Sequence, residues 1–354
     1  MRQQLSFLII FSMRILLTSS QAPFLRGGAE MHADNLEAAL HRAGHAVERI
    51  RLPFKFSPEA DIERLMAFCE GLDLSAPNGQ SVDRLISLQF PGYGLAHPHH
   101  TAWVLHQHRA VYELYEPAQA SPALQRLRTQ VLGFDGRVLP RLKRLFANSK
   151  RVAERMQQFN GVKASPLYHP PPGAEALRCG AEWGYVFFPS RLESLKRQDL
   201  LIEAARHLRC PVKILLGGTG GQQGRYAGLI ERHGLQDRVR LMGSFNNAER
   251  VALYEHALGV VFVPHDEDLG YITLEAMYAA KPVITCTDSG GPLEFVVPGE
   301  TGWVVAPEPK ALAEAIEALW ADKARSRAMG EAGRARIEQL GLSWDRVVEV
   351  LTCN

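Results

Sequence analysis

Apolar and polar positions alternate between two periods along the chain from residue 13 onward. Short apolar runs, such as 15–18, 185–189 and 259–264, have the length and composition of buried strands. Each is followed, sooner or later, by a stretch in which apolar residues recur every three or four positions, which is typical of a helix with one buried face. This alternation favours parallel βαβ units, so we predict an α/β fold.

The predicted elements fall into two groups. The first has strands at 15–18, 45–49, 84–88 and 102–105 and helices at 29–42, 122–132, 138–146 and 150–159. The second has strands at 185–189, 212–216, 239–242, 259–264 and 283–286 and helices at 198–208, 224–233, 247–257, 271–280, from 310 onward and at 343–351. Between the groups, prolines and a glycine at 170–173 can continue neither a helix nor a sheet. We therefore predict an N-terminal domain over 1–172, a C-terminal domain over 173–342, and a last segment, 343–354, that returns to the first domain.

Composition changes this picture little. The 354 residues suffice for two domains, and 46% apolar residues with a net charge of +2 describe an ordinary globular protein without the basic surplus of nucleic-acid binders. Five scattered cysteines without a CxxC pair suit a reducing cytoplasm. No apolar run has the length of a membrane span. Residues 1–12 allow two interpretations, a signal peptide or an upstream extension, and we favour the extension because Arg14 interrupts the apolar run.

Two carboxylates separated by seven residues give the strongest chemical signal. Glu267 lies in a loop that leaves the carboxyl end of the strand 259–264, and Glu275 lies in the first turns of the helix after Gly270. Ligands of open α/β sheets bind at this edge. The helix N-terminus also offers free N–H groups to an anion. Carboxylates beside an anion site suit a ligand with phosphates in the middle and hydroxyls on both sides, which is the layout of a nucleotide sugar.

Two cations follow another predicted strand. Arg191 and Lys196 come directly after the strand 185–189, in the string PSRLESLKRQDLLIEA. Taken alone, they would be explained by a solvated basic loop. Together with Glu267 and Glu275 they favour a site for a diphosphate, whose negative charge two cations would stabilise as it leaves.

Two glycine-rich turns also follow strands. Gly27 and Gly28 follow the first strand, and the string GGTG at 217–220 follows the strand 212–216. Glycines there let a ligand approach the backbone, although a plain turn or a flexible connection is the simpler explanation. The sequence has no GxGxxG of a nicotinamide-dinucleotide fold, and GGTG lacks the Gly-Lys-Ser/Thr ending of a phosphate loop.

Five histidines lie within the string HPHHTAWVLHQH at 97–108. Their spacing fits no HExxH helix and no acidic ligand is near, so we predict no metal site. His106 follows the strand 102–105 and would point toward a ligand, whereas a buried structural histidine is the alternative.

The stretch Arg137–Arg155 holds seven basic residues and one acid, interleaved with four large apolar residues. We interpret it as a basic amphipathic stretch that would allow peripheral contact with an anionic membrane. A solvated helix face is the plainer alternative.

Several of these strings resemble one family. The strings EDLGYITLEAM (267–277) and CTDSGGPLEFVVPGETGWVV (286–305) are similar to the E-x7-E region of the retaining, family 4-type glycosyltransferases with the GT-B fold. The strings PSRLESLKRQDLLIEA (189–204), FANSKRVAERM (146–156) and LYHPPP (167–172) resemble other parts of that family. The resemblance implies two Rossmann-like, doubly wound domains facing each other across a cleft, with acceptor residues in the first and the nucleotide sugar in the second. It also implies metal-free transfer of a hexose from a UDP- or GDP-sugar to a hydroxyl of a glycan or lipid-linked acceptor, in surface polysaccharide assembly.

The resemblance also implies roles for individual residues. Arg191 and Lys196 would grip the diphosphate, Glu267 the transferred sugar, and Glu275 the ribose, while His106 would orient the sugar. The backbone and polar groups that complete the donor site would be those of Gly27, Gly28, Ser244, Phe245, Leu269, Gly270, Tyr271 and Thr273. No protein nucleophile and no cofactor is implied, because the donor phosphate would take the acceptor's proton. One departure from the family is Ala280, which stands where a glycine is usual.

Other functions stay open at this stage. A GT-B nucleotide-sugar epimerase would turn over its substrate without an acceptor, and a non-catalytic nucleotide-sugar-binding protein would bind without turnover. A nicotinamide oxidoreductase is disfavoured by the missing GxGxxG. We expect a cytoplasmic protein that binds a donor, an acceptor and no nucleic acid, with the basic stretch allowing contact with the inner face of a membrane.

Overall fold

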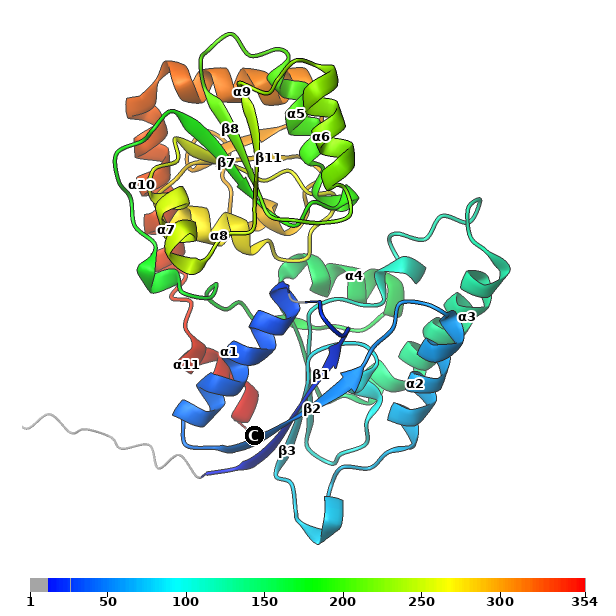
Figure 1. Cartoon of the computed structure of the whole chain (residues 1–354). Helices are drawn as coiled ribbons and strands as arrows, with labels where there is room; N and C mark the ends of the chain where they lie inside the picture. The colour runs from blue at the N-terminus through cyan, green and yellow to red at the C-terminus, as the bar shows by residue number, and fades with distance from the viewer. Residues whose placement is uncertain (1–11, 26, 354) are drawn as a thin grey trace, which may run out of the picture. The chain divides into compact units, whose positions relative to one another are not determined.

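A computed structural model describes residues 12–25 and 27–353, so the predicted extension lies, except for Ser12, outside the described residues. The chain forms two compact units, Met1–His169 with Ser343–Asn354, and Pro170–Leu342. The first division falls three residues before the boundary predicted from the prolines. Figure 1 shows the helices and strands of both units.

The first unit is built on a six-stranded parallel sheet with the strand order β2-β1-β3-β4-β5-β6. Its strands are β1 (Arg14–Gln21), β2 (Ala46–Pro53), β3 (Arg84–Ser87), β4 (His100–Val104), β5 (Arg144–Ala147) and β6 (Ser165–Pro166). Its helices are α1 (Gly28–Arg42), α2 (Glu59–Gly71), α3 (Pro122–Val138), α4 (Lys150–Asn160) and α11 (Trp344–Thr352). Side chains of a strand point alternately to the two faces of a sheet. In β4, Trp103 accordingly packs with α1 and α11, whereas Ala102 and Val104 pack with α3 and α4.

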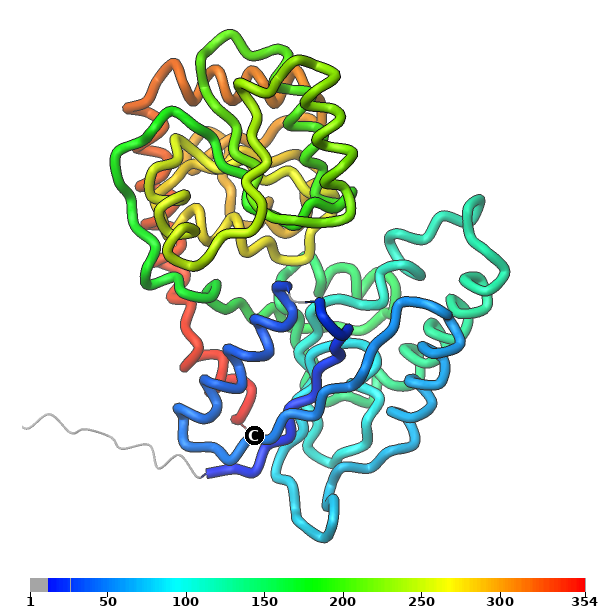
Figure 2. The backbone as a smooth tube through the Cα atoms, viewed as in Figure 1, coloured from blue at the N-terminus to red at the C-terminus, as the bar shows by residue number. Residues whose placement is uncertain are grey.

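The helix α11 joins the far end of the chain to the first unit. Figure 2 shows the red C-terminal segment running beside the blue helix α1. Ser343 caps the helix by accepting a hydrogen bond from the Arg346 N–H. Trp344 then packs against the buried His169, with ring centroids 5.1 Å apart.

The second unit also holds six parallel strands, in the order β12-β11-β10-β7-β8-β9. Its strands are β7 (Tyr185–Pro189), β8 (Lys213–Gly217), β9 (Val239–Gly243), β10 (Gly259–Val261), β11 (Val283–Cys286) and β12 (Gly302–Val305). Its helices are α5 (Gln198–Ala205), α6 (Gln223–Arg232), α7 (Asn247–Glu255), α8 (Tyr271–Tyr278), α9 (Pro309–Ala321) and α10 (Lys323–Gln339). Val186 and Phe188 pack with α5, α6 and α9 on one face, while Phe187 meets Tyr254 of α7 on the other (Figure 1). The strand order reverses between β7 and β10, which makes that pair the topological switch point of this sheet.

The sequence prediction was wrong over 138–146. This segment is not a helix but the end of α3, a short 3-10 turn and strand β5. Pro140 does not fit a helix interior. Burial alternates along β5, because Leu145 and Ala147 are buried while Arg144 and Phe146 are half-buried, and this is the two-residue period of a strand. Helix α2 was not predicted. Within the described residues, no helix is both long and apolar enough to cross a membrane.

Candidate functional site

The charged residues singled out in the second half of the sequence lie around the switch point of the second sheet. Arg191 and Lys196 follow β7, and Glu267 follows β10, which is the direct parallel neighbour of β7. Because carboxyl ends of parallel strands meet at one edge, these three residues emerge from the same edge of the sheet. The fold therefore brings two cations and a carboxylate to the place where α/β sheets bind ligands.

Lys196 and Glu267 form a sheltered ion pair. The Nζ atom of Lys196 lies 2.5 Å from Oε2 of Glu267, and their side chains are only 17% and 19% exposed. Lys196 ends a short 3-10 turn, Ser194–Lys196, and its Nζ also lies 5.7 Å from the centre of the Phe262 ring. A lysine in this position can exchange its carboxylate partner for a phosphate oxygen of a ligand.

Arg191 lies on a loop that the glycine run supports. Gly218 has a φ of +121°, and a Cβ atom there would lie 2.3 Å from the Ser190 carbonyl oxygen. A hydrogen bond from the Leu192 N–H to the Thr219 carbonyl, 3.0 Å long, joins the loop after β7 to the glycine run after β8. The run 217–220 is thus a close-packed connection. The exposed Arg191 guanidinium has no hydrogen bond or ion pair within the part of the chain that the structure describes.

Glu275 lies on α8 and is held by two side chains of α7. Its Oε1 accepts a hydrogen bond from Nη1 of Arg250 at 2.5 Å, and its Oε2 accepts one from the Tyr254 hydroxyl at 2.6 Å. Burial raises the pKa of Glu275 above its ordinary value, although Arg250 and Tyr254 act in the opposite direction. Each carboxylate oxygen keeps a second lone pair for a hydroxyl donor.

The segment between the two carboxylates is fixed by the backbone. Gly270, with a φ of +84°, precedes α8, and Leu269 and Thr273 are buried. The Thr273 hydroxyl has no hydrogen-bond partner among the described residues. Gly290, with a φ of +73°, lets the following N–H of Gly291 donate to the Glu267 carbonyl at 2.8 Å, where any Cβ at Gly290 would clash. Tyr271 is half-buried in the first turn of α8.

Ser244 and Phe245 connect β9 to α7. Ser244 is exposed, whereas Phe245 packs against Phe187, with 6.0 Å between ring centroids. Gly217 allows this packing, because a Cβ there would lie 2.6 Å from the Phe245 ring. These two residues therefore stand at the carboxyl end of β9, on the same edge as Lys196.

The remaining predicted site residues belong to the first unit. Gly27 precedes α1, its N–H donating to Oε2 of Glu30 at 2.8 Å, and Gly28 is the first residue of the helix. His106 lies two residues beyond β4, half-buried, with Nδ1 2.7 Å from the Gln107 carbonyl. Both features lie at the carboxyl edge of the first sheet.

The five histidines do not form one group. His97, His99 and His100 precede or begin β4, whereas His106 and His108 follow it. Five residues of strand span about 17 Å, so the two sets lie at opposite ends of the strand. Within residues 12–25 and 27–353, no three His, Cys, Asp or Glu side chains are grouped so as to hold a metal ion.

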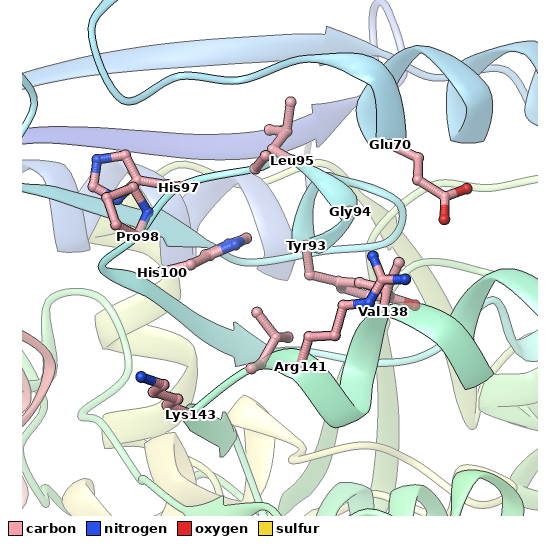
Figure 3. A pocket seen from close by; sticks show the side chains of 12 residues that line it. Glu70, Tyr93, Gly94, Leu95, His97, Pro98, His100, Val138, Arg141 and Lys143 are labelled. Carbon is pink, nitrogen blue, oxygen red and sulfur yellow. The ribbon is translucent and has the colours of Figure 1, made fainter.

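A cavity of about 250 Å³ opens at the other edge of the first sheet, before β4 and β5. Figure 3 shows Tyr93, His97, His100, Arg141 and Lys143 around it. Because it lies at the amino ends of these strands, it contains none of the predicted site residues.

The basic stretch Arg137–Arg155 is not one amphipathic helix. Its residues are divided among α3, a 3-10 turn, β5 and α4. Arg137 pairs with Glu70, and the buried Arg155 lies 3.5 Å from Glu113. The helical periodicity inferred for it came from the wrong assignment of 138–146.

Sequence reasoning missed four residues that contact the predicted ones. Arg250 and Tyr254 bind Glu275, and Arg197 and Asp288 form a bidentate ion pair beside Lys196 and Glu267. Arg250 and Tyr254 are four positions apart, so they share one face of α7, and this spacing was a signal that could have been used. For Arg197 and Asp288, 91 residues apart, no such local signal exists.

Known proteins resemble this chain in sequence and in fold. Residues 181–336 match the model of the family described as "Glycosyl transferases group 1". The alpha-1,3/1,6-mannosyltransferase ALG2 of Homo sapiens is 34% identical over 111 residues, which cover 31% of this chain and 26% of that relative. The matched segment thus spans about a quarter of the relative's length.

Solved structures show the same architecture over nearly the whole chain. Sucrose-phosphate synthase from Thermosynechococcus elongatus has a TM-score of 0.78 at 20% identity, with 95% of this chain and 96% of that chain covered. Anabaena HepE in complex with UDP and glucose has a TM-score of 0.69 at 18% identity, with 95% and 97% covered. The chain therefore has the α/β fold of the GT-B glycosyltransferases, and its residues 181–336 are similar to the glycosyl transferases group 1 family.

Proposed function

We propose that this protein is a retaining glycosyltransferase that moves a hexose from a UDP- or GDP-linked donor to a hydroxyl of a glycan or lipid-linked acceptor. The observation that carries the proposal is the sheltered pair of Lys196 and Glu267 at the switch point, next to Arg191. Cations suit a diphosphate, and carboxylates suit the hydroxyls of a sugar and a ribose. A nucleoside-diphosphate sugar has a diphosphate in the middle, with sugar hydroxyls on one side and ribose hydroxyls on the other.

In the proposed reaction the bond between the anomeric carbon and the diphosphate oxygen breaks. Lys196 and Arg191 would neutralise the charge that develops on the leaving diphosphate, which is the largest stabilising contribution to an oxocarbenium-like transition state. The acceptor hydroxyl would give its proton to that diphosphate and form the new bond on the same face, which retains the anomeric configuration. Glu267 would hold hydroxyls of the transferred sugar and Glu275 those of the ribose, with His106 beside the sugar.

The names of similar proteins support the class of substrate. One relative is called a mannosyltransferase, and one structure of similar fold holds UDP and glucose. The first name points to a hexose, and the second structure points to a hexose and a uridine nucleotide. A role in surface polysaccharide assembly, contact with the inner face of a membrane and a cytoplasmic location belong to the same proposal.

The proposal is tested by release of nucleoside diphosphate from a panel of UDP-, GDP-, ADP- and dTDP-hexoses, with and without candidate glycan acceptors. We expect release with one nucleotide class, stimulated by an acceptor, and an NMR spectrum in which the product keeps the donor's anomeric configuration. Inversion would contradict the retaining mechanism. Conversion of the donor sugar without an acceptor would identify an epimerase, and binding without turnover a non-catalytic binding protein.

Transfer should be independent of divalent metal, because Arg191 and Lys196 would supply the charge that a metal supplies elsewhere. We expect the rate to be unchanged when a chelator is added to the assay. A rate that falls to the background with chelator and returns with Mn²⁺ would contradict this part of the proposal.

A further inference from the structure

The two residues of the sheltered ion pair each have a neighbour with an unusual backbone. Arg197 follows Lys196 and has a φ of +56°, and Asp266 precedes Glu267 and has a φ of +47°. A residue with a side chain is strained in this left-handed region and persists there only where its surroundings hold it. Such strain at both members of one pair indicates that the surroundings fix their positions.

The side chain of Arg197 provides a large part of that constraint. Its Nε donates to the Val263 carbonyl and its Nη2 to the Pro264 carbonyl, both at 2.8 Å. Its Nη1 and Nη2 also donate to the two carboxylate oxygens of Asp288, at 2.8 and 2.7 Å. The planar guanidinium therefore joins the loop of Lys196 to the chain that leaves β10 toward Glu267, with the rigid geometry that arginine supplies and lysine does not.

Asp288 holds the other side of this contact. Its carbonyl accepts a hydrogen bond from the Asp266 N–H, and the next carbonyl, of Ser289, accepts one from the Glu267 N–H, both at 2.9 Å. The Nδ1 atom of His265 lies 3.5 Å from the same carboxylate. The Asp288 carboxylate thus holds the Arg197 guanidinium. The backbone carbonyls of Asp288 and Ser289 hold the backbone of Asp266 and Glu267.

We propose that Arg197 and Asp288 are positioning residues that hold the Lys196 ammonium and the Glu267 carboxylate in the geometry required for transfer. This inference rests on the proposed function for its effect on the rate, but not for the geometry. Neither residue is proposed to contact the donor. Their loss should leave the donor's binding groups present and displace the pair by a fraction of an ångström to an ångström, which strongly lowers a rate that depends on orientation.

The test compares Arg197→Gly and Asp288→Asn with variants of a second ion pair in the same unit. Glycine adopts the left-handed conformation without strain, so Arg197→Gly removes the side chain and keeps the turn. Arg225 of α6 and Asp199 of α5 form a second, more exposed ion pair, 2.8 Å apart, so Arg225→Ala and Asp199→Asn are the controls. We expect kcat to fall about tenfold or more in the two test variants, with a KM for the donor within about threefold of the wild type. The controls should keep the wild-type kcat, and kcat is compared only for protein that an unfolding curve shows to be folded at the assay temperature.

A second readout does not require turnover. The rate at which an amine-reactive reagent labels Lys196, measured by peptide mass spectrometry, reports how firmly its Nζ is held. We expect labelling to be several times faster in folded Arg197→Gly and Asp288→Asn than in the wild type and the controls. Unchanged labelling, or an unchanged kcat, overturns the proposal. If the wild type transfers no sugar, the proposed function fails, and labelling alone still decides whether the two residues position Lys196.

Discussion

Lys196 is the side chain on which the proposed chemistry depends most. It is bound to Glu267 at 2.5 Å, is mostly shielded from solvent, and lies at the switch point of the sheet. A fixed cation in a sheltered site costs no reorganisation when charge develops on a leaving group.

Replacing this lysine tests its role directly. We expect Lys196→Ala to lower kcat about 100-fold or more, which is the usual effect of removing one preorganised donor. Lys213 is the matched control, because its exposed ammonium donates to the Asp237 carbonyl in the same unit. Near-normal turnover in Lys196→Ala, measured under saturating donor, would contradict the assignment of Lys196 to the diphosphate.

Ala280 stands at a position that requires a left-handed backbone conformation. The sequence comparison noted alanine where glycine is usual, and the structure gives this alanine a φ of +49°. A left-handed conformation costs a non-glycine residue about 1–2 kcal/mol, whereas glycine adds about 0.4–1 kcal/mol of unfolded-state entropy. We therefore expect Ala280→Gly to raise the free energy of unfolding by up to about 1 kcal/mol. Denaturant titration checks this, and a lower midpoint would contradict it.

The packing of helix α7 against helix α8 fixes the position of the Glu275 carboxylate. Arg250 and Tyr254 lie on one face of α7 and bind the two oxygens of a carboxylate on α8. The ribose side of the proposed donor site would therefore depend on the packing of two helices and not on Glu275 alone.

This arrangement predicts a pH dependence of nucleotide binding. Burial raises the pKa of Glu275, and only the ionised carboxylate accepts hydrogen bonds from two ribose hydroxyls. Affinity for a nucleoside diphosphate should therefore weaken as the pH falls, starting above the ordinary glutamate range. Tyr254→Phe removes a hydrogen bond that lowers the pKa of Glu275, so the pH at which the affinity is half lost should rise further. Calorimetric titration from pH 8 down to the ordinary glutamate range would show it, and a flat profile in both proteins would speak against the role of Glu275.

Most elements could be predicted from the sequence, because their periods are clear. The strands β7 and β11 begin and end where the apolar runs do. The segment 138–146 was assigned wrongly because its two-residue period covers only the four residues of β5, and because Pro140, which does not fit a helix interior, was not used. Glu267, Lys196 and Glu275 were predicted at this edge because they follow strands or lie in the first turns of a helix, and their roles stay predictions. Arg197 and Asp288 were not, because their contact joins loops that are distant in the sequence.

The whole molecule consists of two units, each built on its own six-stranded sheet and its own hydrophobic core. The first unit contains buried histidines that the proposed reaction does not use. His100 is 9% exposed, and its Nε2 lies 2.7 Å from the Ser87 hydroxyl. Burial lowers the pKa of His100 from 6.5 to about 4. It therefore stays neutral in the folded protein at pH values where the unfolded chain is protonated.

The stability of the first unit should consequently fall in weak acid. Below pH 6.5 the unfolded chain binds a proton at this histidine that the folded chain does not bind until about pH 4. Between pH 7 and 5 the loss is about 2 kcal/mol for this group. We expect the denaturant midpoint to fall over this range, and to fall less in His100→Gln. An equal fall in both proteins would show that other groups cause it.

The central claim is that this chain binds a nucleoside-diphosphate sugar through the second unit, and a thermal-shift panel tests it most directly. UDP-, GDP-, ADP- and dTDP-sugars would be added to the purified wild type and to Lys196→Ala. A ligand that binds only the folded state must raise the unfolding midpoint. The account predicts a rise with one nucleotide class in the wild type and a smaller rise in the variant. No rise with any of the four classes, in protein shown to be folded, would contradict it.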